Sequence, residues 1–194
     1  MMKNKQEIRM TELRALQNED NKMRIEGYAV VFNSPSHPIY GEWIEYVDRS
    51  AFNGCDMKDV VLRYNHKDSH PIMARTKNQS LQLIVDDKGL KIEAELIDTV
   101  SNRDLYKSIK EGLVDKMSFR FSVSKNEWDY STTPTTRRIL GFDKIFDVSI
   151  VDEPAYEATE VYVRSKEEAQ EEKRKYQQKK LEFEKEKMKL LLSI

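Results

Sequence analysis

Cysteine is almost absent from this chain of 194 residues, where Cys55 is the only one. A single cysteine cannot form an internal disulfide, so the chain fits a reducing compartment. Together with only three histidines, it offers too few ligands for a convincing structural zinc site. The six glycines are spread singly, without a GxGxxG or Walker motif, so nucleotide chemistry is not expected. We therefore expect no cofactor.

Long apolar runs and an excess of positive charge are missing as well. No run of about 18 apolar residues could form a membrane-spanning helix, and the polar N-terminus MMKNKQEIRM lacks the apolar centre of a signal peptide. The formal net charge is -1, whereas proteins that bind nucleic acids usually present a basic face. The composition predicts a soluble, cytoplasmic protein whose main partner is neither a membrane nor a nucleic acid.

Short strands dominate what is present. One helix is predicted at residues 101–112, with Ser101 as its N-cap and Gly112 as its C-cap. Alternating or β-branched segments predict strands at residues 24–33, 41–48, 60–64, 80–86, 90–97, 117–123, 143–151 and 161–163. With 39% hydrophobic residues the chain can build one core. These elements predict a mainly β domain with helices (α+β) over residues 1–164, built on a barrel or closed sheet.

The last part of the chain, residues 165–194, has a different composition. It holds nine Lys or Arg and seven Asp or Glu, without glycine or proline, which predicts a long solvated helix. An apolar or aromatic residue recurs every seventh position, at Ala169, Tyr176, Phe183 and Leu190. A coiled coil needs a second apolar position three residues after each of these, and in this chain Glu or Lys occupies that position after Ala169, Tyr176 and Phe183. We expect a single charged tail, with weak self-association as the alternative.

Serine catalysis needs a hydroxyl, a base within hydrogen-bond reach and a group that orients the base. His37 and His70 lie in proline-containing turns, whereas His66 follows an apolar strand that can hold an imidazole at a sheet edge. His66 is the preferred base, and an exposed loop histidine is the competing interpretation. Ser118 begins an alternating strand after a tight connection and could project into a groove. From the residues alone, a polar strand position is the simpler interpretation of Ser118.

A metal site is the other chemistry that the histidines could support. His66 and His70 have the spacing of two zinc ligands on a helix. Asn65 and Pro71 argue against a helix there, and no glutamate of an HExxH motif stands between the two histidines. A metal-dependent hydrolase is therefore the weaker alternative.

Read in order, several segments of the chain resemble the prohead proteases of tailed bacteriophages. The resemblance spans about residues 7 to 164 and does not cover the tail. It is carried by Glu26-Gly27-Tyr28-Ala29 with Phe32-Asn33, by Ser50-Ala51-Phe52 in place of the family's Gly-Ala-Phe, by Asn65-His66 at the end of a strand, by the turn from Asp86 to Leu90, by a helical segment from Asp98 to Gly112, by Met117-Ser118-Phe119-Arg120-Phe121, and by residues 147–155.

The resemblance implies a fold similar to the herpesvirus assembly proteases, a β-barrel wrapped by helices. It also implies that Ser118 is the nucleophile and His66 the general base. Asp147 matches the acid that would orient the imidazole, with a strand-edge carboxylate as the alternative. Because a basic residue helps to build the oxyanion site in herpesvirus-type proteases, Arg137 and Arg138 are candidates for that role, and main-chain N–H groups are the alternative.

The function that the resemblance implies is that of a serine endopeptidase in prohead maturation. Its substrates would be scaffold segments, the major capsid protein and the protease itself, inside the prohead in the cytoplasm of a bacterial host, with the gene carried by a phage or prophage. A homo-oligomer is consistent with this, since herpesvirus-type relatives are activated by dimerisation. The tail would be a targeting or scaffold-like helix that is removed late.

Two further expectations accompany this function. A histidine base must be neutral, and an unperturbed histidine titrates near pH 6.5, so activity should fall below about pH 6. The rival interpretation is a non-catalytic capsid assembly or scaffolding protein that uses the same barrel, with the tail as its active part. Such a scaffold would not need both His66 and Ser118.

Overall fold

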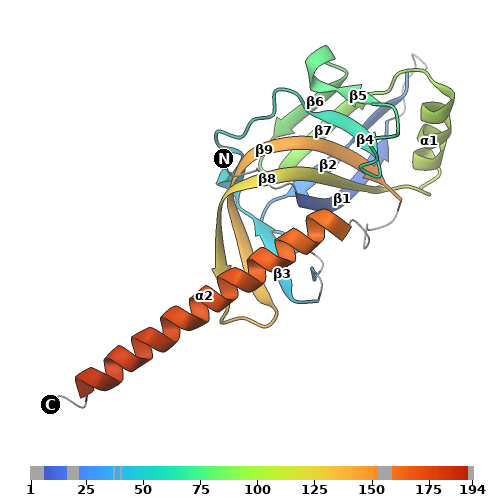
Figure 1. Ribbon diagram of the computed structural model, residues 1–194. Coiled ribbons are helices and arrows are strands. Elements are labelled where there is room, and N and C mark those ends of the chain that lie inside the picture. The colour runs from blue at the N-terminus through green and yellow to red at the C-terminus, as the bar shows by residue number, and fades with distance from the viewer. Residues whose placement is uncertain (1–6, 17–21, 37, 40, 153–158, 192–194) are drawn as a thin grey trace. The chain divides into compact units, whose positions relative to one another are not determined.

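The computed structural model describes residues 7–16, 22–36, 38–39, 41–152 and 159–191 (Figure 1). The chain divides into two units, Met1–Tyr156 and Glu157–Ile194, and each is considered by itself. His37 lies outside the described residues, as do residues 153–155 at the end of the last segment that carries the resemblance.

The first unit is built on a nine-stranded sheet with the order β5-β4-β9-β8-β1-β2-β7-β6, and β3 pairs with β9 beside this path. Strands β3 and β4 run parallel to β9, and the other pairs are antiparallel. The strands are β1 (Glu7–Ala15), β2 (Arg24–Val31), β3 (Trp43–Val47), β4 (Val61–Tyr64), β5 (Ala74–Arg75), β6 (Leu81–Val85), β7 (Gly89–Glu95), β8 (Lys116–Asp129) and β9 (Thr135–Val151). The predicted mainly β, α+β class is confirmed.

The sheet curves strongly, as Figure 1 shows. Its two edge strands, β5 and β6, follow each other in the chain and are joined through the short 3-10 helix η2 (Thr76–Asn78), so the edges return towards each other. In the described part of the chain no strand ladder joins β5 to β6, so hydrogen bonding between strands does not close the predicted barrel there.

Strands β8 and β9 form a hairpin that is much longer than the two separate strands predicted at residues 117–123 and 143–151. The pairing continues outwards to Asp129, opposite Thr136. Aromatic contacts support this outer half: the rings of Trp43 and Trp128 lie 5.6 Å apart, edge to face, and Trp128 stacks on Tyr130. Many residues of the outer half are polar, so the alternation of apolar residues that marks a strand is weak there.

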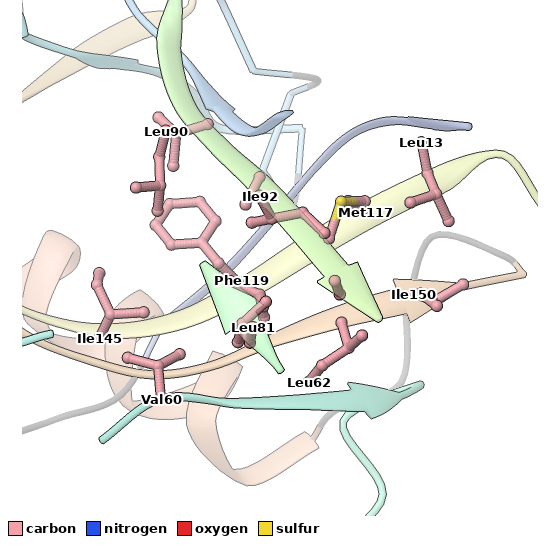
Figure 2. Close-up of a cluster of buried hydrophobic side chains, with 14 of the residues drawn as sticks. Leu13, Val60, Leu62, Leu81, Leu90, Ile92, Met117, Phe119, Ile145 and Ile150 are labelled. Carbon is pink, nitrogen blue, oxygen red and sulfur yellow. The ribbon is translucent and has the colours of Figure 1, made fainter. Parts of the chain in front are cut away.

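One face of the sheet carries the core. Figure 2 shows Met117 and Phe119 of β8 in a cluster with Ile145 and Ile150 of β9 and Leu62 of β4. Successive side chains of a strand point to opposite faces. The polar residues between these apolar positions therefore face away from the core, and this second face carries the candidate site.

Helix α1 (Val100–Lys110) is the α-helix of the first unit among the described residues. Its buried residues include Leu105 and Ile109, one helical turn apart. The predicted N-cap, Ser101, is wrong, because the side chain of Thr99 accepts the hydrogen bond from the main-chain nitrogen of Asn102. Gly112 follows the helix with a φ of 70°, the left-handed conformation that favours glycine after a helix end.

The second unit contains helix α2 (Thr159–Leu191). The strand predicted at residues 161–163 is wrong, because α2 already includes them. No glycine or proline separates this segment from the charged sequence that follows, so helix formation continues through it. The predicted domain boundary between residues 164 and 165 falls inside this helix and stays a prediction.

Neither helix that the structure describes has an apolar stretch long enough to cross a membrane.

Gly89 stands where β7 begins close against β2. A Cβ at this position would lie 1.9 Å from the main-chain oxygen of Val30. We expect Gly89→Ala to lower the free energy of unfolding by about 3 kcal/mol, because the backbone must shift to admit the methyl group. Urea denaturation measures this loss.

The matched control is Gly112→Ala. Gly112 also has a positive φ, but a Cβ there would meet nothing within 4 Å. The expected loss is about 1 kcal/mol, from the left-handed backbone alone. Equal losses in the two variants would contradict the close approach at Gly89.

Candidate active site

His66 lies just beyond the end of β4, in an unusual backbone conformation. Asn65 and His66 have φ angles of 52° and 54°, which are uncommon for residues other than glycine. Strand β9 and the residue that follows it anchor Asn65: its main-chain nitrogen donates to the carbonyl oxygen of Ile150 at 2.8 Å. The main-chain nitrogen of Asp152 donates to Oδ1 of Asn65 at 3.3 Å. These bonds to Asn65 help to hold the strained backbone in place.

The imidazole of His66 is bound to Asp147 of β9. Nδ1 lies 2.5 Å from Oδ1, and the two side chains are 7% and 3% exposed. An ionised carboxylate only accepts hydrogen bonds, so Nδ1 carries the proton in this pair. In a neutral imidazole the lone pair then lies on Nε2. This is the tautomer in which a histidine can take a proton from a serine.

Ser118 lies on the same face of the sheet as Asp147. In the register of β8 and β9, Ser118 stands opposite Ser149 and Arg120 stands opposite Asp147. Directly opposed residues of an antiparallel pair share one face, with Cβ atoms about 5 Å apart. Ser118, Arg120, Asp147 and Ser149 therefore form one group of neighbouring side chains on the face opposite the core.

Oγ of Ser118 and Nε2 of His66 are both buried, and neither has a hydrogen-bond partner among the described residues. Ser118 is only 1% exposed. A buried hydroxyl and a buried imidazole nitrogen without partners are costly to keep. Serine acyl transfer requires groups of these two kinds, a hydroxyl and a neutral imidazole nitrogen.

Sequence reasoning missed two members of this group, Arg120 and Ser149. By their local sequence alone, both residues resemble ordinary polar positions of a strand. The available signal was the repetition of polar residues at every second position in two strands: Ser118 and Arg120 lie on one side of their strand, and Asp147 and Ser149 lie on one side of theirs. Which residues of β8 stand opposite which residues of β9 depends on the pairing of the two strands, and the local sequence does not reveal it.

The structure contradicts the expectation that Arg137 and Arg138 contribute to the oxyanion site. Both lie in the outer half of the hairpin, where Arg137 stands opposite Trp128. Trp128 is ten positions beyond Ser118 along β8, a distance of roughly 30 Å in an extended strand. Nη1 of Arg137 forms a buried ion pair with Glu45 at 3.0 Å. Arg138 pairs with Asp48 and Asn33.

A structural role for Arg137 leads to a prediction. Arg137→Ala would remove the cation that pairs with the buried carboxylate of Glu45, which is 1% exposed. We expect a loss of about 3 to 5 kcal/mol in the free energy of unfolding, which urea denaturation measures. Arg138→Ala, which removes an exposed pair, is expected to cost less than about 1 kcal/mol.

The remaining candidates have other partners. Nδ1 of His70 lies 3.2 Å from the carbonyl oxygen of Pro71, and its ring packs edge to face against Tyr64. No group of three or more His, Cys, Asp or Glu side chains suited to a metal ion occurs within the described ranges. Burial raises the pKa of the Cys55 thiol to about 11, so at neutral pH Cys55 is a poor rival to serine as a nucleophile.

Comparisons with known proteins identify the chain's relatives. Its fold is similar to the solved structure titled "Structure of the bacteriophage T4 capsid assembly protease, gp21", with a TM-score of 0.50 and 11% sequence identity over 77% of this chain and 99% of that one. No curated protein sequence matches the chain. The model of a family described as caudovirus prohead serine protease matches residues 9–174, which extends beyond the boundary expected at residue 164 into α2. The chain therefore belongs to the caudovirus prohead serine protease family.

Proposed function

We propose that this protein is the maturation protease of a tailed-phage prohead, with Ser118 as its nucleophile, His66 as its general base and Asp147 as the residue that orients the base. It acts inside the prohead in the host cytoplasm and cleaves segments of the major capsid protein, the scaffold or itself. The charged helix α2 is a targeting or scaffold-like extension that is removed during maturation.

The observation that carries this proposal is the buried pair between His66 and Asp147. Its 2.5 Å contact leaves the lone pair of Nε2 without a described partner. In the register of β8 and β9, Ser118 stands opposite Ser149, which is two residues after Asp147 on the same face of the sheet. A scaffold without catalysis would have no need for a buried imidazole and a buried hydroxyl that lack partners, since both reduce stability.

The chemistry that follows is acyl transfer in two steps. Oγ of Ser118 attacks the carbonyl carbon of the scissile peptide while its proton moves to Nε2 of His66. The C–N bond breaks as His66 passes that proton to the leaving amine. Water then attacks the acyl-enzyme, with His66 again as the base, and Ser118 leaves as the free hydroxyl. Throughout, Asp147 holds the ring and stabilises the imidazolium.

A serine-directed phosphonate probe tests the proposal on the purified full chain, before any substrate is known. We expect covalent labelling of Ser118, located by peptide mass spectrometry, and much slower labelling of His66→Ala. Co-expression with the major capsid protein then tests the substrate class, because the capsid protein should become shorter on a gel. Labelling at another serine would refute the assignment of the nucleophile. If neither labelling nor cleavage is observed, in the purified chain or in assembled proheads, the scaffolding interpretation is favoured.

A further inference from the structure

We propose that Ser149 and Arg120 are positioning residues, which together hold the imidazole of His66 against Asp147. This inference rests on the proposed function, since it concerns the geometry of the same site. Each of the two side chains contacts both members of the pair at once, on the main chain of His66 and on the carboxylate of Asp147.

Ser149 links the first oxygen of the carboxylate to the main-chain nitrogen of His66. Its hydroxyl donates to Oδ1 of Asp147 at 3.0 Å and accepts from the main-chain nitrogen of His66 at 3.2 Å. Oδ1 is also the oxygen that binds Nδ1 of the imidazole. The hydroxyl therefore closes a ring that runs from the backbone of His66 through Ser149 and Asp147 to the imidazole of the same residue.

Arg120 forms a similar link on the other oxygen of the carboxylate. Its Nε lies 2.8 Å from Oδ2 of Asp147 in an ion pair, and its Nη2 donates to the carbonyl oxygen of His66 at 3.0 Å. The N–H and C=O groups of His66 are thus both bound by side chains that also contact Asp147. These links fix the loop residue to the two strands that carry Ser118 and Asp147.

The position of His66 explains why such links are needed. The residue stands outside β4, with a φ of 54° that its own backbone does not favour. A displacement of about 1 Å in a reacting group can reduce a catalytic rate about 100-fold. Without Ser149 or Arg120, the His66 backbone would lose one of its two side-chain anchors and the carboxylate would lose one of its contacts.

Charge alone does not account for Arg120. A guanidinium beside Asp147 competes with the imidazolium for the same negative charge, so its electrostatic effect on the protonated histidine is unfavourable. Its useful effect is geometric, because the contact at Oδ2 leaves Oδ1 directed at the imidazole. The planar guanidinium can reach two acceptors at once, whereas a lysine at this position would be a single point charge.

The test compares Ser149→Ala, Ser149→Thr, Arg120→Ala and Arg120→Lys in the full chain. Two readouts are needed: the rate of Ser118 labelling by the phosphonate probe, and the downfield proton NMR signal of a hydrogen-bonded imidazole Nδ1–H at His66. We expect labelling to fall about 100-fold in both alanine variants, with loss or broadening of the NMR signal. Ser149→Thr keeps a hydroxyl and should stay near wild type, whereas Arg120→Lys should restore only part of the rate.

Two controls separate positioning from a general loss of structure. Ser122→Ala removes another buried serine of β8, whose hydroxyl contacts Asp143. Arg24→Ala removes an arginine of β2 that pairs with Glu95. Both should label at the wild-type rate. Thermal unfolding shows whether each variant is folded, and Ser149→Thr tests the hydroxyl even if Ser149→Ala unfolds.

The possible results separate the two proposals. Wild-type labelling rates in folded Ser149→Ala and Arg120→Ala would overturn the positioning role. So would slow labelling with an unchanged NMR signal, because the His66–Asp147 bond would then be intact. If the wild-type chain shows the NMR signal and the variants lose it, but wild-type Ser118 is never labelled, the positioning role stands and the proposed nucleophile fails.

Discussion

Ser118→Ala is expected to reduce the proposed cleavage of the capsid protein to a rate about 10⁶-fold below wild type. The substitution removes the only atom that can form the acyl-enzyme in the proposed mechanism and leaves the rest of the site in place. Because Ser118 is buried and its hydroxyl has no partner among the described residues, its loss should not destabilise the fold. Quantitative gels of capsid protein over time measure the effect.

The matched control for this prediction is Ser122→Ala on the same strand, which should cleave normally. A second check uses the non-additivity of groups that act together. His66→Ala combined with Ser118→Ala should be no slower than Ser118→Ala by itself. A double variant that loses a further large factor would mean that the two residues do not act in one step.

Asp147→Asn is expected to reduce the cleavage rate about 10⁴-fold. The two side chains have nearly the same shape, but an amide can present an N–H where the carboxylate accepts a hydrogen bond. The imidazole would then turn its lone pair towards position 147 and carry its proton on Nε2, where it cannot accept the proton of Ser118. Steady-state kinetics should show the loss in kcat, with KM little changed.

Asp143→Asn provides the same chemical change four positions earlier on β9. Its carboxylate accepts from the hydroxyl of Ser122 at 3.3 Å, and Ser122 stands opposite Lys144 of β9, three positions before Asp147. We expect normal kinetics for this variant. If Asp147→Asn also cleaves normally, Asp147 is only a strand-edge carboxylate and another group orients His66.

The fold was predictable where local signals were strong. The hairpin of β6 and β7 alternates clearly on both sides of a short turn that ends at Gly89, and the strand that contains Ser118 has an equally strict pattern. Helix α1 was found because Leu105 and Ile109 are one turn apart and Gly112 ends the helix. These features depend on residues that are close in sequence, which a pattern can reveal.

The parts that could not be predicted depend on distant contacts. The outer half of the β8–β9 hairpin is supported by Trp43, which belongs to another strand. Arg137 was considered for the oxyanion site because of its place before a strand, but its partner Glu45 is 92 residues away in sequence. The same holds for the site itself, where only the pairing of β8 with β9 reveals that Arg120 neighbours Asp147 and that Ser118 neighbours Ser149.

The parallel pairing of β4 with β9 has a consequence for the synthesis of the protein. His66 and Asp147 are 81 residues apart, and His66 and Ser149 are 83 apart. A nascent chain that still lacks β9 therefore contains His66 and Ser118 but neither the carboxylate nor the hydroxyl that binds the histidine. Since contacts between distant residues form late, the growing polypeptide has no assembled site until the end of β9 has left the ribosome.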